Sequence, residues 1–317
     1  MTTEPRQAEA PATPPYDPAV PSDAELTDPE NLPAGWSTEL AQRYSLVASS
    51  ARPGLKQYLR QLWERRHFLI AFANARVVSL YTSARLGQIW QLLTPLLNAG
   101  VYLLLFGVLL NTSRGVDNFI AFLIIGVFIF NFTQRSVRHG ADSVSRNLGL
   151  IRALHFPRAT LPLAYTLSEL QQLGGALVVM AGAVIITGEP VTLGWLLVPV
   201  AVALQSVFNA GLSLVVARVV AQTPDVNQVL PFVLRTGLYT SGVFYSIPVF
   251  TAGAPEWVRV LLSINPAAVY IDLVRTALLV EHDPLPYVWP LAVGWALLAV
   301  VVGFVFFWRA ETRYGRG

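Results

Sequence analysis

Residues able to carry out chemistry are few in this sequence and do not cluster. The four histidines are scattered, without an H-E-x-x-H pattern or a second metal-binding residue at ligand spacing: His67, His139, His155 and His282. A phosphate-binding loop of the form G-x-x-x-x-G-K-[ST] needs a lysine, and the single lysine, Lys56, stands between Leu55 and Gln57. The sequence has no G-x-S-x-G pattern and no cysteine. We therefore expect no catalytic residue, no metal and no cofactor bound by this chain.

Charged residues inside apolar runs are the second group of candidates, because a charge in a bilayer is costly and usually functional. Glu169 lies within such a run and is followed by Gln171 and Gln172. It either pairs with an arginine of a neighbouring span or belongs to a polar seam between helices. Arg235 lies near the start of a later run and either lines a pathway or extends to the membrane interface.

These residues are embedded in the composition of a membrane protein. Of 317 residues, 54% are hydrophobic and 13% are charged, and the mean hydropathy is +0.50. Runs of about 20 apolar residues, enough to cross about 30 Å of hydrocarbon, predict six spans, near 89–111, 118–140, 161–187, 192–217, 229–250 and 287–308. With six crossings most arginines share one side with both termini, and the positive-inside rule makes that side the cytoplasm. We expect an all-α multi-pass protein of the plasma membrane.

The regions outside the spans differ in character. Residues 1–40 carry eight prolines and eight carboxylates and predict a disordered cytoplasmic tail. No signal peptide is apparent, since the first apolar run begins far beyond residue 30. Within residues 41–88, apolar residues at helical spacing between Leu55 and Leu80 alternate with arginines. This pattern predicts an amphipathic helix in the membrane interface, or alternatively an ordinary soluble helix with a basic face. Residues 89–308 are the predicted transmembrane domain, and 309–317 a short cytoplasmic tail.

The segment "SARLGQIWQLLTPLL", residues 83–97, joins the predicted interface helix to the first span. Gly87 permits a tight junction, Trp90 anchors at the headgroup level, and Pro95 kinks the helix one turn further in. We expect this segment to be a hinge.

Two other segments do not fit a simple count of spans. "INPAAVYIDLVRTALLVEHDP", residues 264–284, predicts a helix that begins at Asn265 and Pro266 and is too short and too charged to span, so we expect a re-entrant or interfacial element on the outer side. "RNLGLIRALHFPRATLP", residues 146–162, is too apolar for a solvated loop. It predicts a short cytoplasmic helix that either docks a partner or packs on the chain's own spans.

Taken together, the interface helix, "LGQIWQLLTP", the six spans, "RNLGLIRALHFPRATLP", "SGVFYS" and "NPAAVYIDLVR" resemble the ABC-2 type permeases that export polysaccharides, O-antigens and teichoic acids. The resemblance covers residues 55 to about 310. It implies a homodimer that pairs with two copies of a separate ATPase, which binds ATP and Mg²⁺. The sequence departs from the family at "TPDV", where Pro224 stands before Asp225 in place of an arginine.

The resemblance also implies two working parts. A coupling helix over residues 147–157 would dock into the ATPase through residues of the cytoplasmic loop: Leu150, Ile151, Arg152, His155, Phe156 and Arg158. Gate helices would lie over residues 251–281, and their candidate residues are Asn265, Pro266 and Arg275.

The implied substrate is a lipid-linked glycan with an anionic diphosphate, either O-antigen-like or, given the preference for arginine over lysine, an actinobacterial cell-wall galactan. Its path would combine anion-binding arginines, aromatic rings for sugars and the two charges within spans: Arg65, Arg66, Tyr102, Phe106, Arg135, Arg138, Glu169, Arg235 and Tyr239. The arginines are equally expected from the positive-inside rule alone. The alternatives are an ABC-2 drug or lipid exporter and, from another class, an integral-membrane glycosyl- or acyltransferase. We expect no nucleic-acid partner.

Overall fold

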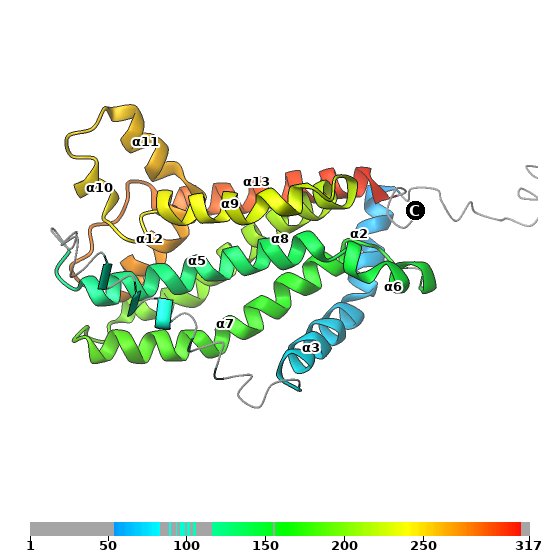
Figure 1. The fold of residues 1–317 in the computed structure, drawn as a ribbon, viewed down its shortest axis with the longest axis horizontal. Coiled ribbons are helices and arrows are strands. Elements are labelled where there is room, and N and C mark those ends of the chain that lie inside the picture. Colours follow the sequence, from blue (N-terminus) through cyan, green and yellow to red (C-terminus); the bar gives the residue numbers. More distant parts are fainter. Residues whose placement is uncertain are drawn as a thin grey trace, which may run out of the picture. The chain divides into compact units, whose positions relative to one another are not determined.

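A computed structural model describes residues 54–82, 116–154 and 156–311, with a few isolated positions between 89 and 105. The described residues are helical and include no strand (Figure 1). Several predictions lie outside them: the tail 1–40, most of the first span, the hinge residues Gly87, Trp90 and Pro95, the aromatic residues Tyr102 and Phe106, and His155.

The described helices occur in the following order along the chain. They are α2 (Leu55–Glu64), α3 (Arg66–Thr82), α5 (Phe119–Asp142), η3 (Ser145–Asn147), α6 (Leu148–Ala153), α7 (Thr160–Ile186), η4 (Leu193–Leu197), α8 (Val198–Gln222), α9 (Val226–Thr240), α10 (Ile247–Phe250), α11 (Glu256–Ile264), α12 (Pro266–Leu278) and α13 (Val288–Arg309). Among the described helices, four are long and apolar enough to cross a membrane: α5, α7, α8 with the preceding η4 turn, and α13. They coincide with the second, third, fourth and sixth predicted spans.

The centre of the bundle is α5, which packs against α7, α8, α9 and α12. Its apolar run, "FIAFLIIGVFIFNF", is hydrophobic on all sides, and most of these residues are buried. A helix that is apolar all round is expected to be enclosed by other helices rather than to present one face to lipid. This all-round apolar character explains why α5 is largely buried although it is also long enough to span a membrane.

The pair α8 and α13 packs backbone against backbone. A Cβ atom on Gly303 would collide with the carbonyl group of Gly211, and a Cβ on Gly211 would collide with the backbone of Ala299. Small residues at helix interfaces allow this close approach in membrane proteins, where dispersion contacts replace the hydrophobic drive for association.

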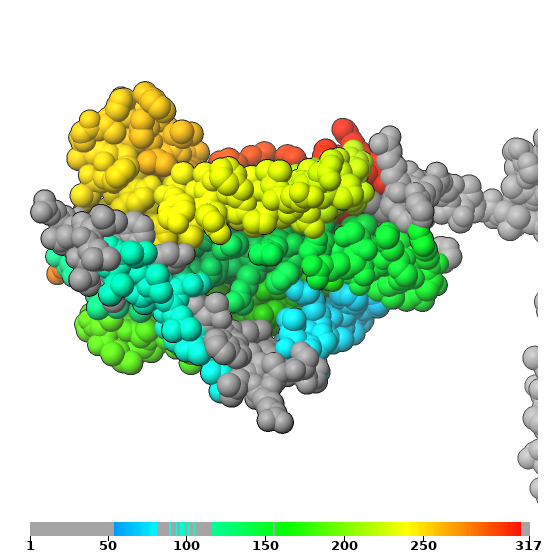
Figure 2. All heavy atoms as spheres, in the orientation of Figure 1, coloured from blue at the N-terminus to red at the C-terminus, as the bar shows by residue number. Residues whose placement is uncertain are grey.

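The fifth predicted span, 229–250, is not one continuous helix. The helix α9 has 15 residues with Pro231 inside it and ends at Thr240, and at about 1.5 Å per residue it is roughly 22 Å long, short of the apolar thickness. The chain then turns at Ser241 and Gly242, whose φ of 66° favours glycine. Figure 2 shows α9 along one face of the molecule, with Phe232 71% exposed there.

The predicted single interface helix is broken into α2 and α3 at Arg65, where the chain makes a turn. On α2 the apolar face is only partly covered: Tyr58 is buried, whereas Leu59 and Trp63 are exposed. An exposed apolar face beside charged residues fits a helix at a membrane interface.

A sharp bend separates α11 from α12, whose axes differ by 74°. The predicted helix start is confirmed: the Asn265 side chain accepts a hydrogen bond from the Ala267 N–H, and Pro266 occupies the first turn. A bend of this kind occurs in a broken span or in a re-entrant element such as the one expected here, and the charged residues Asp272 and Arg275 of α12 are both buried. Asp272 accepts from the Leu285 N–H at 2.7 Å and lies 2.7 Å from the His282 Nε2.

The Arg275 guanidinium donates hydrogen bonds to backbone carbonyls. Its Nε and Nη2 donate to the Phe122 carbonyl at 3.2 and 2.9 Å, in the first turn of α5. Its Nη1 donates to the Gly242 carbonyl at 2.9 Å, and Nη2 to the Val243 carbonyl at 3.0 Å. Since both carbonyls belong to the turn after α9, one guanidinium ties α12, α5 and the end of α9 together.

This tie depends on the missing side chain of Gly126, because a Cβ there would lie 2.6 Å from the Arg275 Nη2. We expect Gly126→Ala to displace the guanidinium and to lower the free energy of unfolding by on the order of 2 kcal/mol, as hydrogen bonds to a charged group are lost. Thermal unfolding of the purified protein in detergent measures this. Gly174→Ala on α7 is the control, because nothing lies within 4 Å of its Cβ position; equal melting of the two variants would contradict the tie.

Candidate functional site

Glu169 joins three helices within the bundle. Its side chain is buried, and its Oε1 accepts a hydrogen bond from Arg76 Nη2 of α3 at 3.2 Å and lies 2.6 Å from His139 Nδ1 of α5. Arg76 also donates to the Ser168 hydroxyl at 3.0 Å, and its guanidinium lies 4.0 Å from the centre of the Tyr165 ring. The ion pair expected of Glu169 is therefore present, but its arginine belongs to the interface region and not to a neighbouring span.

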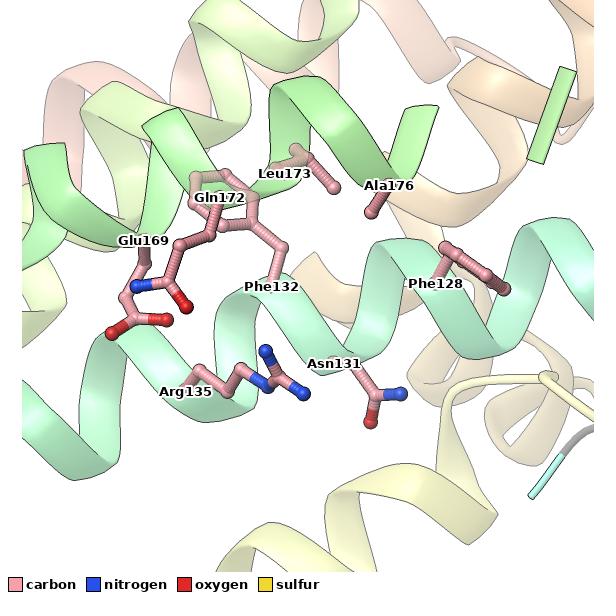
Figure 3. Close-up of a pocket in the computed structure, with 8 residues that line it drawn as sticks. All are labelled: Phe128, Asn131, Phe132, Arg135, Glu169, Gln172, Leu173 and Ala176. Carbon is pink, nitrogen blue, oxygen red and sulfur yellow. The ribbon is translucent and has the colours of Figure 1, made fainter. Parts of the chain in front are cut away.

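A small pocket lies beside Glu169, between α5 and α7. Its volume is about 30 Å³, and it is lined by Phe128, Asn131, Phe132, Arg135, Glu169, Gln172, Leu173 and Ala176. Figure 3 shows the polar residues of this pocket, with Asn131 and Arg135 on α5 and Glu169 and Gln172 on α7. Such a volume admits about one water-sized group, so the pocket can receive a single polar group among four polar side chains.

Of the predicted path residues that are described, Glu169 and Arg135 meet at this pocket. The others are exposed elsewhere: Arg65 and Arg66 at the α2–α3 junction, Arg138 on α5, and Arg235 and Tyr239 on α9. Sequence reasoning missed Asn131, although Asn131 and Arg135 are four residues apart and so share one face of a helix. It also missed Arg76 and His139, whose pairing with α7 no local pattern indicates.

The segment predicted to form the coupling helix is helical over η3 and α6. Ile151 is buried in an apolar cluster with residues such as Tyr58 and Phe307, and Leu150 and Phe156 pack against the same cluster. These three residues hold α6 to the chain's own helices, as the second interpretation of this loop expects. The exposed surface of α6 and the residue after it consists instead of Leu148, Arg152 and Leu154 among others.

Glu311, which was not among the predicted site residues, links the helices at the end of the bundle that carries α6. Glu311, just after α13, accepts from the Arg158 N–H at 2.9 Å and from the Tyr58 hydroxyl at 2.8 Å. The Tyr58 hydroxyl in turn accepts from the Ala159 N–H at 3.1 Å, and the Arg158 guanidinium binds the Glu311 carbonyl. This Glu311 clamp connects α2, the start of α7 and the end of α13. Its only sequence signal is a lone acidic residue among arginines after the last apolar run.

The opposite end of the bundle, where α5 begins and α7 ends, has a larger cavity of about 930 Å³. Asn118 holds its wall together by donating to Glu189 Oε1 at 3.0 Å and to the Thr187 carbonyl at 3.2 Å. Glu189 accepts in addition from the Val280 N–H at 3.3 Å. The end of α7 is thereby joined to the start of α5 and to the segment after α12.

The Glu311 clamp makes stability depend on pH. Burial raises the pKa of the Glu311 carboxyl, and the hydrogen bonds from Arg158 and Tyr58 lower it by less. A raised pKa means that the folded state binds the Glu311 proton more tightly than the unfolded state does. The stabilisation that this proton gives is therefore lost as the pH rises above the usual glutamate range.

We expect Glu311→Gln to remove this pH dependence, which thermal melting of both proteins between pH 5 and pH 8, roughly the range above the normal glutamate pKa, measures. Tyr58→Phe keeps the ring but removes two hydrogen bonds, and should cost about 1–3 kcal/mol. Phe68→Leu, whose ring packs on Phe72 and Phe156 rather than on the carboxylate, is the control for altered packing of α3. Identical pH profiles for the wild type and Glu311→Gln would show that the pKa of the Glu311 carboxyl is not raised in the folded protein.

Comparison with known proteins places this arrangement in a family. The chain is 27% identical over 256 residues to "O-antigen export system permease protein RfbA" of Myxococcus xanthus, covering 81% of this chain and 94% of that protein. It is 23% identical over 201 residues to a protein of the same name from Klebsiella pneumoniae, covering 63% and 75%. The family model of the ABC-2 type transporter matches residues 68–279, more than half of the sequence. The chain therefore belongs to the ABC-2 type transporter family.

Proposed function

We propose that this chain is the membrane subunit of an ATP-driven exporter that moves a lipid-linked polysaccharide, a cell-wall galactan or an O-antigen-like glycan, from the cytoplasm across the plasma membrane. The observation that carries the proposal is the similarity to O-antigen export permeases along nearly the full length of one of them. The family match extends from α3 to the end of α12, so it includes the Glu169 pocket and the bent α11–α12 pair.

The orientation follows from charge. Arginines gather at the end of the bundle that carries α2, α6 and Glu311, where Arg65, Arg66, Arg146 and Arg152 are exposed. Basic residues next to membrane spans favour the cytoplasmic side. This end therefore faces the cytoplasm, together with both termini, and the end with the 930 Å³ cavity faces outward.

The energy comes from a separate ATPase, because the chain has no lysine in a phosphate-binding loop. Two copies of the permease pair with two copies of the ATPase, which holds ATP and Mg²⁺. The exposed apolar residues Leu148 and Leu154, with Arg152 between them, give α6 a surface for this partner, because exposed apolar residues rimmed by charge are typical of interaction sites. The buried residues of α6 then transmit force into the permease.

Depletion of the protein in the producing bacterium tests the cargo. We expect a lipid-linked glycan to collect on the cytoplasmic face of the membrane, where it is protected from an added glycan-modifying enzyme until the cells are opened. Expression of the wild-type chain restores export. If no glycan accumulates and a lipid or drug is retained in its place, the chain is an exporter of that other class and the glycan proposal fails.

Charge reversal at Arg152 tests the docking surface. Because a cation on α6 would face the ATPase, we expect Arg152→Glu to reduce co-purification of the ATPase and to reduce export by about tenfold or more, as expected when like charges oppose each other in an interface. Arg259→Glu on α11 is the matched control, since Arg259 is exposed at the opposite end of the bundle. Full assembly and export by Arg152→Glu would rule out this docking role.

A further inference from the structure

The pocket between α5 and α7 contains a buried carboxylate oxygen without a partner. Glu169 is 2% exposed, and while its Oε1 binds Arg76 and His139, its Oε2 has no hydrogen-bond partner within the described part of the chain. A buried acceptor left unsatisfied costs about 1–3 kcal/mol. Other buried polar atoms, such as those of Asn209, also lack partners, but Asn209 does not line this pocket.

The second feature of the pocket is a cation without an anion. Arg135 lines the pocket and is half-buried. Its guanidinium forms no hydrogen bond or ion pair with any other described residue, and the same holds for the side-chain amide of Asn131. A guanidinium in this position favours a phosphate or carboxylate, which it can bind through two N–H groups.

These two features limit the chemistry of the ligand. The Oε2 of Glu169 needs a hydrogen-bond donor, but an ammonium group would be repelled by Arg135 and Arg76 together. The donor is therefore a neutral group such as a hydroxyl, and the volume of about 30 Å³ admits one such group. The anion bound by Arg135 stays at the mouth of the pocket, where this side chain is half-exposed. Phe128, Phe132 and Leu173 complete an apolar wall.

We propose that this pocket binds the junction between lipid phosphate and first sugar of the substrate: Arg135 binds the phosphate, and Glu169 accepts a hydrogen bond from a hydroxyl of that sugar. The assignment rests on the proposed function and makes it specific, because it selects one arginine of the inner side over the others. The ion pair with Arg76 orients Glu169 so that one oxygen remains available to the sugar. A hydroxyl near a phosphate also occurs in phosphatidylglycerol, so the test compares the two sources.

The test uses the full chain, purified and placed in nanodiscs of phosphatidylcholine, without the ATPase. Three probes are titrated and their binding is followed by native mass spectrometry: a polyprenyl diphosphate hexose, the same polyprenyl diphosphate without sugar, and phosphatidylglycerol. We expect the sugar-bearing probe to bind about tenfold tighter than either of the others, which is the effect of one or two well-placed hydrogen bonds.

Two matched pairs of variants assign the groups. Arg135→Gln should weaken both polyprenyl probes about tenfold, as loss of a charge-assisted contact predicts, whereas Arg138→Gln, three residues further along α5 and outside the pocket, should leave them unchanged. Glu169→Gln should abolish the preference for the sugar-bearing probe. Arg76→Gln removes the ion pair that orients Glu169 but keeps the carboxylate acceptor in the pocket, and should therefore reduce that preference less than Glu169→Gln does.

Three outcomes would overturn the assignment. Equal binding of the two polyprenyl probes would mean that water alone occupies the pocket, and equal binding of phosphatidylglycerol would make it a site for bulk phospholipid. Equal losses from Arg135→Gln and Arg138→Gln would reduce the effect to general charge attraction. Because binding is measured without the ATPase or export, a protein that selects the sugar probe yet exports no glycan would refute the proposed function alone.

Discussion

A charged side chain buried in an apolar bundle must find its partners within the protein, and three of the buried charged side chains of this chain each join separate helices. Arg275 fastens the turn after α9 to α5. Glu169 fastens α3 to α5 and α7, and Glu311 fastens α2 and the start of α7 to the end of α13. Apolar faces such as those of α5 and α8 supply burial but accept many partners, so the buried charges select one arrangement among those that would bury equal area.

These junctions divide the molecule into a frame and peripheral parts. The frame consists of α5, α7, α8, α12 and α13, which share one large apolar cluster. Because Arg275 anchors α12 in this frame, the largely exposed α11 is the part of the predicted gate region that is held least. At the other end, α6 shares an apolar cluster with Tyr58 of α2 and Phe307 of α13. A force applied to α6 therefore reaches α2 and α13 through contacts that the Glu311 clamp reinforces.

The sequence predicted much of the fold, because its strongest signals are local. Long apolar runs located α5, α7, α8 and α13, and the Asn265–Pro266 pair located the start of α12. The fifth span was predicted to continue to residue 250 because its apolar character continues through Gly242, whereas α9 ends at Thr240. The Arg275 guanidinium, distant in sequence, binds the carbonyls of the turn that follows. The candidate site was half predicted: Glu169 and Arg135 were named, but Arg76 and Tyr58 meet their carboxylates only through tertiary packing, which leaves no periodic pattern in the sequence.

These three side chains also differ in how many of their polar atoms have hydrogen-bond partners. Arg275 donates four hydrogen bonds, and both carboxylate oxygens of Glu311 accept one each. Every nitrogen of the one and every carboxylate oxygen of the other therefore has a partner within the protein, as expected of groups that act in stability. Glu169 has one oxygen without a partner, and Arg135 beside it has no anion among the described residues. A carboxylate that is held in place through one oxygen and has no partner at the other is preorganised to bind a ligand. Folding has already desolvated the unpartnered oxygen, so a hydrogen bond from a ligand adds to the binding free energy without a further ordering penalty. Incomplete satisfaction therefore separates the binding candidate from the two structural junctions more sharply than burial or charge does.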